Sequence, residues 1–224
     1  MTTRTMTLAH AIKVHPPHAI NGTYAITPDC ADTADLLRRV RQALVGGISV
    51  LQYRNKTASL ALCREQALAL CKLAHEFSVP FIVNDDVLLA AHVGADGVHL
   101  GAGDGGVAEA RAVLGANKLI GISCYNRLPA AISAARAGAD YVAFGAFYSS
   151  PTKPYAVVAS KEILSLARAQ LAVPIVAIGG ITLSNGAPLV QAGADALAVI
   201  SALFNSPNIC ATAQKFSNLF PATT

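Results

Sequence analysis

The chain has 224 residues, of which 53% are hydrophobic and 13% are charged, with a formal net charge of +4. This composition supplies a large core and excludes an intrinsically disordered chain. The charge excess is small and no long basic run carries it, which argues against a nucleic-acid partner, whereas a small anionic ligand would account for a few clustered cations.

The predicted elements, taken in chain order, begin after an N-terminal extension. Residues 1–20 are interrupted by Lys13, His15 and two prolines and are expected to be loosely held, whereas residues 21–224 are expected to form one domain. Short apolar segments then alternate with longer helical patterns. The strands are expected at 23–27, 48–54, 80–84, 97–100, 118–123, 140–145, 174–178 and 195–200. The clearest helices are expected at 32–46, 58–78, 107–115, 127–137, 160–171 and 184–192.

One fragment recurs three times, as GADGVHL (94–100), GADYVAF (138–144) and GADALAV (193–199). Each copy follows an Ala-rich helical stretch and leads into an apolar strand. Its glycine suits the left-handed position that ends a helix. The recurrence therefore predicts the same short helix-to-strand loop three times, and an internally repetitive βα protein.

Eight βα units in a chain of this length predict a single TIM barrel, because βαβ crossovers favour parallel strands. Several of the predicted strands are nearly all apolar, as strands covered on both faces should be. An open, doubly wound sheet is the structural alternative, although it would normally have fewer strands for the same length. In a barrel, functional residues are expected at the carboxyl ends of the strands.

The five cysteines are odd in number and show no CxxC spacing, so they predict reduced thiols and neither a disulfide framework nor a zinc site. No stretch resembles a signal peptide, and no apolar run is long enough to span a bilayer. We therefore expect a cytoplasmic protein without a membrane partner. The sequence leaves open whether the protein is a homo-oligomer.

Polar side chains gather where the predicted strands end. Gln52, Arg54 and Lys56 alternate at the end of the second strand, so in an extended chain all three point the same way. Polar or small residues also follow the other strands, and all are candidates for one rim. They are Asn84, Asp85, Asp104, Ser123, Ser150, Thr152, Lys153, Gly179, Gly180, Ile200 and Ser201.

Each candidate also has a purely structural interpretation. Asp85 or Asp104 alone could cap the next helix, and Lys56 could be a solvated loop cation. Ser123 could satisfy a neighbouring backbone group, and His99 fits a packed structural histidine better than a base. It is the combination of these residues at one end of the barrel that favours a binding site.

The charges predict what this site holds. Arg54, Lys56 and Lys153 supply three cations, and Asp85 and Asp104 supply two carboxylates. Cations on one rim suit a polyphosphate, and Arg binds phosphate through two parallel hydrogen bonds. Carboxylates that lie near phosphate oxygens suit Mg²⁺. The sequence thus predicts a pyrophosphate bound together with a magnesium ion.

A second anion site is predicted after the last two strands. The segments IGGI and VISAL resemble the phosphate site that many barrels build from these two loops. Bare backbone N–H groups and the start of a short helix would hold a monophosphate there.

Seven motifs, in their order along the chain, resemble those of the thiamine-phosphate synthase family over roughly residues 22–205. They are LQYRNK, IVNDD, GADGVHLG with Asp104, GISCYN, GADYVAFGAFYSSPTKP, VAIGGI and GADALAVISALF. GAD or IGG alone is shared by many barrels, whereas the ordered set, and above all Gln-x-Arg-x-Lys, Asn-Asp and Pro-Thr-Lys, is specific.

The resemblance implies a transferase that joins a hydroxymethylpyrimidine pyrophosphate to a thiazole phosphate, with Mg²⁺ as cofactor. The products are thiamine phosphate and pyrophosphate. The implied mechanism is dissociative: pyrophosphate leaves, the electron-rich aminopyrimidine stabilises the resulting cation, and the thiazole nitrogen attacks. The protein would mainly supply positioning and electrostatic stabilisation. No protein nucleophile is needed, and Cys124 is interpreted as a packing residue.

The resemblance also assigns roles to individual residues. Gln52 and Ser123 would contact the pyrimidine, and Asp85 and Asp104 would bind Mg²⁺. Ser123 and Lys153 would lie closest to the chemical step. The pyrophosphate would be held by Arg54, Lys56, Asn84 and Lys153. The thiazole phosphate would be held by Ser150, Thr152, Gly180, Ile200 and Ser201.

Some positions depart from the family pattern. Asp86 stands where the family often has Arg, Ser150 where Thr is common, and Ala102 and Gly103 leave bare a loop that often carries Gln and an acid. Tyr125 stands where many members have His.

Two alternatives to the synthase are considered. One is a thiazole tautomerase-like or other phosphate-ligand barrel isomerase, and the other is a non-catalytic sensor of phosphate ligands. The related tautomerases often use a His near the position of Tyr125. Neither alternative has an evident need for both Asp85 and Asp104, so the synthase is favoured.

Overall fold

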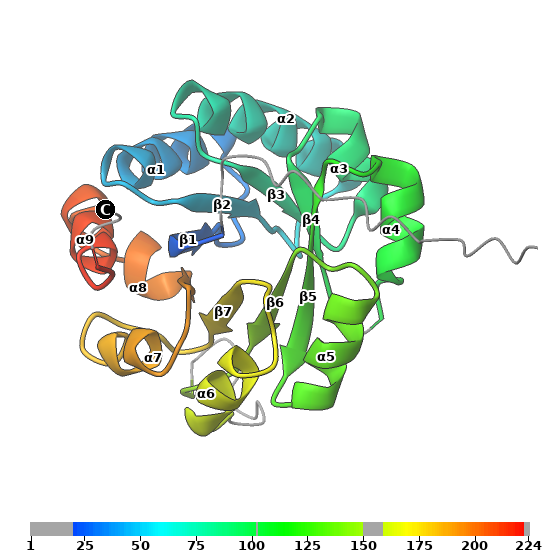
Figure 1. Ribbon diagram of the computed structural model, residues 1–224. Coiled ribbons are helices and arrows are strands. Elements are labelled where there is room, and N and C mark those ends of the chain that lie inside the picture. The colour runs from blue at the N-terminus through cyan, green and yellow to red at the C-terminus, as the bar shows by residue number, and fades with distance from the viewer. Residues whose placement is uncertain (1–19, 102, 150–158, 222–224) are drawn as a thin grey trace, which may run out of the picture.

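Eight parallel strands close into a barrel in the computed structural model, which describes residues 20–101, 103–149 and 159–221 (Figure 1). Strands that are consecutive in the sequence pair with each other, and β1 pairs with β8 to complete the ring. The predicted TIM barrel is therefore confirmed, and the open doubly wound alternative is wrong. The strands are β1 (Gly22–Ile26), β2 (Val50–Tyr53), β3 (Phe81–Asn84), β4 (Gly97–Leu100), β5 (Leu119–Tyr125), β6 (Tyr141–Phe144), β7 (Ile175–Ile178) and β8 (Ala196–Val199).

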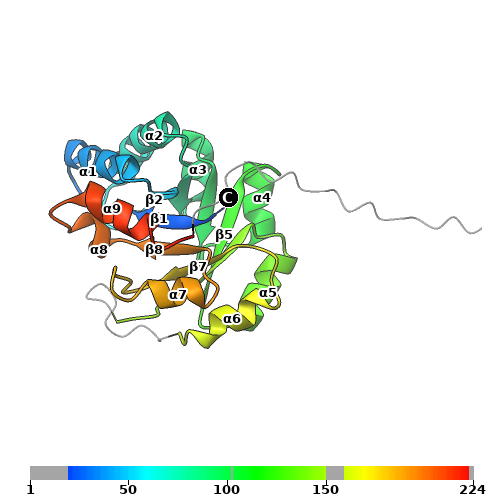
Figure 2. The ribbon, with the colours of Figure 1, turned by 60° about the vertical axis from the view of Figure 1, so that its left-hand side comes forward.

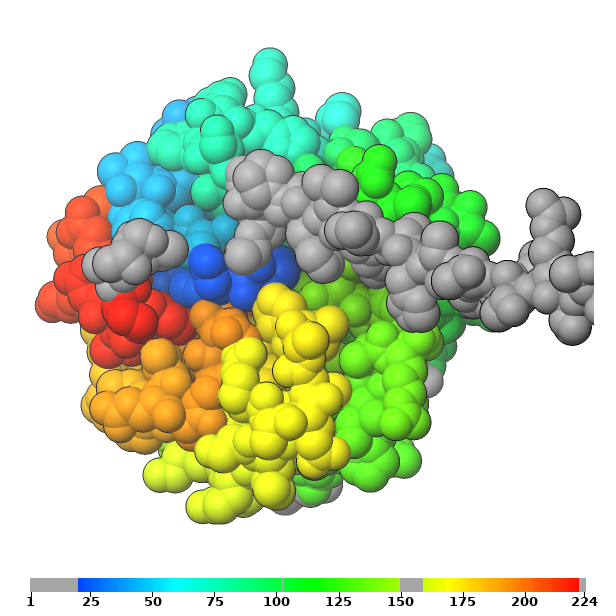
Figure 3. Space-filling view, in the orientation of Figure 1, coloured from blue at the N-terminus to red at the C-terminus, as the bar shows by residue number. Residues whose placement is uncertain are grey.

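Helices cover the outside of the barrel, as Figure 2 shows from a second direction. The helices expected from the sequence do not include α3, α8 or α9. In Figure 3, α9 lies beside α1, which it contacts, so the last helix closes the outer layer against the first. The helices are α1 (Thr33–Val45), α2 (Leu60–Glu76), α3 (Val87–Val93), α4 (Val107–Leu114), α5 (Leu128–Arg136), α6 (Glu162–Arg168), α7 (Ala187–Gln191), α8 (Ser201–Phe204) and α9 (Ile209–Ser217).

Among the described residues, no helix is both long and apolar enough to cross a membrane. The predicted N-terminal extension lies outside the described residues except for Ile20, which is buried with the side chains of the barrel interior.

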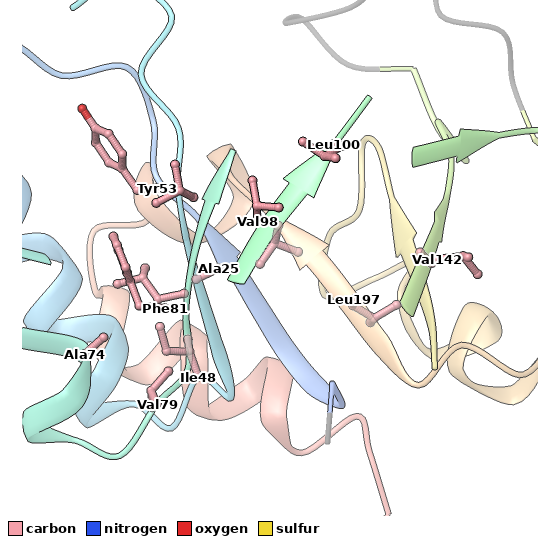
Figure 4. Packing of buried hydrophobic residues seen from close by; sticks show 14 of the residues in the cluster. Ala25, Ile48, Tyr53, Ala74, Val79, Phe81, Val98, Leu100, Val142 and Leu197 are labelled. Carbon is pink, nitrogen blue, oxygen red and sulfur yellow. The ribbon is translucent and has the colours of Figure 1, made fainter. Parts of the chain in front are cut away.

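The strands contribute alternate side chains to two separate cores. The outer core lies between strands and helices, and Figure 4 shows members of it, such as Phe81 on β3 and Ala74 on α2. The inner core fills the barrel with Tyr24, Tyr141 and smaller apolar residues. Because the barrel interior is packed, a ligand can bind only at the mouth.

The GAD repeat has a structural explanation. Gly94, Gly138 and Gly193 have φ values of 70°, 96° and 113°, as the left-handed end of a helix requires. The following aspartate then accepts an N–H from the first or second residue of the preceding strand in the barrel. The acceptor and donor pairs are Asp96 with Phe81, Asp140 with Ile120 and Asp195 with Ile175.

Each GAD aspartate is also paired with a basic side chain from a helix. The partners are His75 for Asp96, Arg111 for Asp140 and Arg168 for Asp195. The repeat therefore ties the amino end of one strand to its neighbour and to a helix. These aspartates lie at the opposite end of the barrel from the predicted site, where polar residues generally serve stability.

Candidate active site

The described residues among the predicted site residues all lie at the carboxyl ends of the strands. Gln52 and Ser123 lie on β2 and β5, and Asn84 is the last residue of β3. The others lie in the loops that follow β2, β3, β4, β7 and β8 or, for Ser201, at the start of α8; they are Arg54, Lys56, Asp85, Asp104, Gly180, Ile200 and Ser201. Ser150, Thr152 and Lys153 lie outside the described residues.

The loop after β1 holds the cations that follow β2. Asp29 Oδ1 accepts the Lys56 backbone N–H at 2.8 Å and pairs with the Arg54 guanidinium at 3.2 Å. Thr27 Oγ1 accepts the Arg54 N–H and donates to its carbonyl, each at 2.9 Å. Sequence reasoning missed Thr27 and Asp29, although both follow the end of β1 and the strand-end rule would have found them.

Lys56 and two carboxylates form the charged centre of the site. The Lys56 ammonium pairs with the Asp85 carboxylate, which is about one quarter exposed. Burial, and to a lesser extent the neighbouring Asp104 carboxyl, raise the pKa of Asp85, against the opposing effect of Lys56. Asp85 has a φ of 64°, a conformation that Asp tolerates better than most residues. Lys56 is therefore an ion-paired residue and not an isolated solvated cation.

Neither carboxylate caps the helix that follows it. The α3 cap is Asp86, whose side chain accepts the Leu89 N–H at 2.8 Å. Helix α4 begins after Gly106, and Asp104 accepts instead the Gly101 N–H at 2.8 Å. The capping interpretation is thus wrong for both predicted metal ligands. Asp86, in contrast, does cap a helix, and this role explains why an acidic residue stands at that position.

The donor set fits a hard divalent ion. Among the described residues, no group of three or more His, Cys, Asp or Glu side chains could hold a metal. Mg²⁺ needs no such group, because it keeps several waters and takes other ligands from substrate phosphates. Two neighbouring carboxylates, of which Asp85 is paired with Lys56, would be stabilised by a further cation. Asp85 and Asp104 therefore fit Mg²⁺, whereas a zinc site would need more protein ligands.

Gln52 and Ser123 are both joined to buried side chains below the mouth. The Gln52 amide N–H donates to the Tyr24 hydroxyl at 2.9 Å. Ser123 Oγ lies 2.8 Å from His99 Nε2. His99 is buried, which lowers its pKa to about 4, so the ring is neutral near pH 7. The predicted packed histidine is thus confirmed, and its partner is Ser123 itself.

The loops after β6 and β7 meet in backbone contact. Gly180 has a φ of 63°, and a Cβ at this position would lie 2.6 Å from the Tyr148 carbonyl oxygen and 2.7 Å from that of Ser149. The Tyr148 N–H donates to the Gly179 carbonyl at 3.0 Å. Only glycine fits at position 180, because any side chain would push the two loops apart.

Two hollows lie at opposite ends of the barrel. A groove of about 500 Å³ is lined by Thr182 and Ser201, so the loops after β7 and β8 border the same space. A larger hollow of about 880 Å³ is lined by Gly22, Ser49 and Asp195, which belong to the amino ends of strands. The chemistry-bearing residues border the first end, so the larger hollow is not the candidate site.

All five cysteines lie within the described residues and are free thiols. Cys124 is buried beside Ser123, and burial raises its pKa to about 12, so it is not a thiolate near neutral pH. The packing role predicted for Cys124 agrees with this environment.

A closed parallel barrel with polar residues at the carboxyl end of its strands is the architecture of a TIM-barrel enzyme. Residues 23–203 match the family described as thiamine monophosphate synthase, and the chain belongs to that family. Two similar relatives are named thiamine-phosphate synthase. The one from Thiobacillus denitrificans is 51% identical over 90% of this chain and 95% of its own. The one from Methylobacillus flagellatus is 54% identical over 92% of this chain and 97% of its own.

Solved structures share the fold of this chain, and one of them carries the name of a similar enzyme. A structure titled thiamine phosphate pyrophosphorylase from Pyrococcus furiosus has a TM-score of 0.79 and 31% identity, and the match covers 88% of this chain and 94% of that one. A 3-hexulose-6-phosphate synthase has a TM-score of 0.66 at 14% identity, covering 89% of this chain and all of the other. The second likeness shows the fold alone.

Proposed function

We propose that the protein condenses a hydroxymethylpyrimidine pyrophosphate with a thiazole phosphate to form thiamine phosphate and pyrophosphate, with Mg²⁺ as cofactor. The observation that carries this proposal is the cluster of Arg54, Lys56, Asp85 and Asp104 at one end of the barrel in a chain of this family. Its small-molecule substrates are anionic, as the cations require. The free cysteines support a reducing, cytoplasmic location.

The residues divide between the two substrates. Arg54, Lys56, Asn84 and Lys153 are proposed to bind the pyrophosphate, and Gln52 and Ser123 the pyrimidine. Asp85 and Asp104 would hold the metal, which when bound would neutralise charge on the pyrophosphate oxygens. Phosphate of the thiazole substrate would be held by the remaining proposed ligands, which are Ser150, Thr152, Gly180, Ile200 and Ser201.

The chemistry requires one bond to break and another to form. The bond between the pyrimidine methylene carbon and the pyrophosphate oxygen breaks, and the leaving group takes the electron pair. Arg54 and Lys56 stabilise this developing charge, because they are already held in place by Asp29 and Asp85. The thiazole nitrogen then donates its lone pair to the cationic carbon. Since no proton transfer is needed, the neutral His99 and the protonated Cys124 agree with this mechanism.

The direct test is to mix purified protein with both substrates and Mg²⁺ and to measure thiamine phosphate and pyrophosphate. Equal amounts of the two products are expected. Binding of the thiazole phosphate without product from the pair would exclude the synthase and favour an isomerase or a sensor.

Gly180→Ala is expected to raise the KM for the thiazole phosphate on the order of tenfold, with a smaller effect on the pyrimidine substrate. The added Cβ would collide with the Tyr148 and Ser149 carbonyls and displace the proposed phosphate-binding backbone. Gly115→Ala is the matched control, because Gly115 also has a positive φ but has open space around it, away from the site. Steady-state kinetics with each substrate varied in turn provide the measurement. Equal rises of the two KM values would contradict the proposed division between the substrates.

Lys153→Ala is expected to slow product formation about tenfold to a hundredfold at saturating substrates, since a charge-assisted contact contributes about 1.5–3 kcal/mol. Pro151 and Pro154 flank this lysine in the sequence, and Lys153 is proposed to help exclude water from the cation. The measurement is single-turnover formation of thiamine phosphate, alongside a thermal melt. An unchanged rate constant in a well-folded variant would contradict a role of Lys153 in the chemical step.

A further inference from the structure

A chain of hydrogen bonds crosses the barrel interior beneath the proposed pyrimidine site. Gln52 Nε2 lies 2.9 Å from the Tyr24 hydroxyl, and the two tyrosine hydroxyls of Tyr24 and Tyr141 lie 2.8 Å apart. His99 Nδ1 lies 3.1 Å from the Tyr141 hydroxyl, and His99 Nε2 lies 2.8 Å from Ser123 Oγ. The chain thus connects Gln52 on β2 to Ser123 on β5, through residues on β1, β6 and β4.

Counting the protons shows that every hydrogen bond from Gln52 to Ser123 is donated in the same direction. The Tyr24 oxygen accepts from the Gln52 amide, so its own proton must go to Tyr141, its other neighbour. The Tyr141 proton then goes to His99 Nδ1. A neutral imidazole has one N–H, so the proton lies on Nε2 and is donated to Ser123 Oγ. Ser123 is therefore an acceptor toward His99 and keeps its own proton free to donate.

The other end of the chain is fixed in the same way. Gln52 is only 3% exposed. Every fully buried side-chain polar atom in the described residues has a hydrogen-bond partner. The Gln52 amide nitrogen bonds to Tyr24, and no described residue hydrogen-bonds to its oxygen. The carbonyl oxygen must then reach accessible space. The site accordingly presents an acceptor from Gln52 and a donor from Ser123.

The packing prevents the chain from reorienting easily. Tyr24 and Tyr141 are both fully buried, and the His99 ring stacks on the Tyr141 ring with their centroids 5.5 Å apart. A Cβ on Gly121 would lie 2.0 Å from the Tyr141 ring, so the absence of a side chain at 121 makes room for this tyrosine. Reversal would need the Gln52 amide to flip and every proton in the chain to change partner.

We infer that Tyr24, Tyr141 and His99 are positioning residues that make the site specific for an aminopyrimidine against the corresponding oxopyrimidine. This inference rests on the proposed function and names a specificity determinant of the same site. The exocyclic amino group of an aminopyrimidine would donate to the Gln52 oxygen. Its unprotonated ring nitrogen would accept from the Ser123 hydroxyl. An oxopyrimidine presents the opposite pattern, a carbonyl acceptor beside a ring N–H, and would leave buried polar groups unpaired.

The kinetic test compares Tyr141→Phe with wild type on the aminopyrimidine pyrophosphate and on its oxo analogue. The variant removes the link between Tyr24 and His99, so the Gln52 amide and the Ser123 hydroxyl are no longer held in one orientation. Its ratio of kcat/KM values, amino over oxo, is expected to fall about tenfold or more, with the KM for the thiazole phosphate unchanged. Tyr24→Phe is expected to give the same result and replaces Tyr141→Phe if the latter does not fold.

Tyr53→Phe is the matched control. Tyr53 is another buried tyrosine on β2, next to Gln52 in the sequence, but its hydroxyl donates to Gln66 at 2.9 Å on the outer side of the sheet. Losing that hydroxyl should affect stability while leaving the amino-to-oxo ratio at the wild-type value. A ratio that falls equally in Tyr53→Phe would show a general loss of structure and overturn the inference.

A second measurement does not depend on turnover. ¹⁵N NMR of the imidazole, assigned to His99 by its loss in His99→Asn, is expected to show Nε2 protonated and Nδ1 unprotonated. The opposite tautomer would reverse the chain and overturn the inference. If wild type forms no thiamine phosphate, the proposed function fails. If wild type forms it and Tyr141→Phe and Tyr24→Phe both discriminate as wild type does, the specificity inference alone fails.

Discussion

Asp85→Asn is expected to reduce turnover about a hundredfold to a thousandfold while the barrel stays folded. The neutral amide would weaken the proposed metal site, whose charge stabilisation is worth several kcal/mol in the transition state. It would also leave the Lys56 ammonium without its carboxylate partner. Asn has nearly the shape of Asp and tolerates the positive φ of this position, so the backbone should not change.

The neighbouring residue offers a matched control for this variant. Asp86→Asn makes the same chemical change one position later, where the side chain caps α3 and Asn caps as well as Asp. This control should retain wild-type turnover. The measurement is the rate of thiamine phosphate formation at saturating substrates across a Mg²⁺ titration, with thermal melts of both variants. Full wild-type activity in excess chelator, or equal loss in both variants, would contradict the metal assignment.

Much of the fold was predictable because its repeat is local. Each GAD fragment combines a glycine that ends a helix with an aspartate that joins two strands, and both requirements act within a few residues of the next strand. Strand order in a barrel then follows chain order. Helix α8 was not predictable in this way, because its 4 residues make too few turns for a hydrophobic period to stand out. Helices α3 and α9 were also missed, although α6 and α7, which are no longer than those two, were predicted.

The site was predictable where a polar residue interrupts or follows an apolar strand. Gln52, Arg54, Lys56 and Asp85 are conspicuous for this reason. Asp29 also follows an apolar strand, but its importance comes from its hydrogen bond with Lys56, which lies 27 residues away in the sequence.

The buried hydrogen-bond chain could not be predicted at all. Tyr24 and Tyr141 look like ordinary core aromatics in the sequence, and their hydroxyls meet across 117 residues. Side chains that face the inside of a barrel meet partners from distant strands, and no local pattern records which hydroxyl meets which. Which groups at the mouth donate and which accept hydrogen bonds thus follows from tertiary packing, whereas the charged residues at the mouth are visible in the sequence.

Two of the GAD aspartates, Asp140 and Asp195, make similar contacts but differ in burial, so we expect their substitution to cause different losses of stability. Asp140 is 7% exposed and accepts from both Arg111, at 2.6 Å, and the Ile120 N–H, at 2.8 Å. Asp195 makes the equivalent contacts with Arg168 and Ile175 but is 31% exposed. Asp140→Ala is expected to cost about 3–5 kcal/mol, because it removes the only carboxylate paired with the Arg111 guanidinium in the described structure and leaves the buried Ile120 N–H without its acceptor.

Asp195→Ala should lower the free energy of unfolding by only about 1–2 kcal/mol, since water can replace the lost carboxylate at an exposed pair. Urea denaturation of the two variants and wild type, followed by circular dichroism, gives the three free energies under one set of conditions. Because a domain of this kind is stable by only about 5–15 kcal/mol, the Asp140 variant should unfold at a clearly lower urea concentration. Equal losses in the two variants would mean that the shared contacts, and not their burial, determine what this repeat contributes to the barrel.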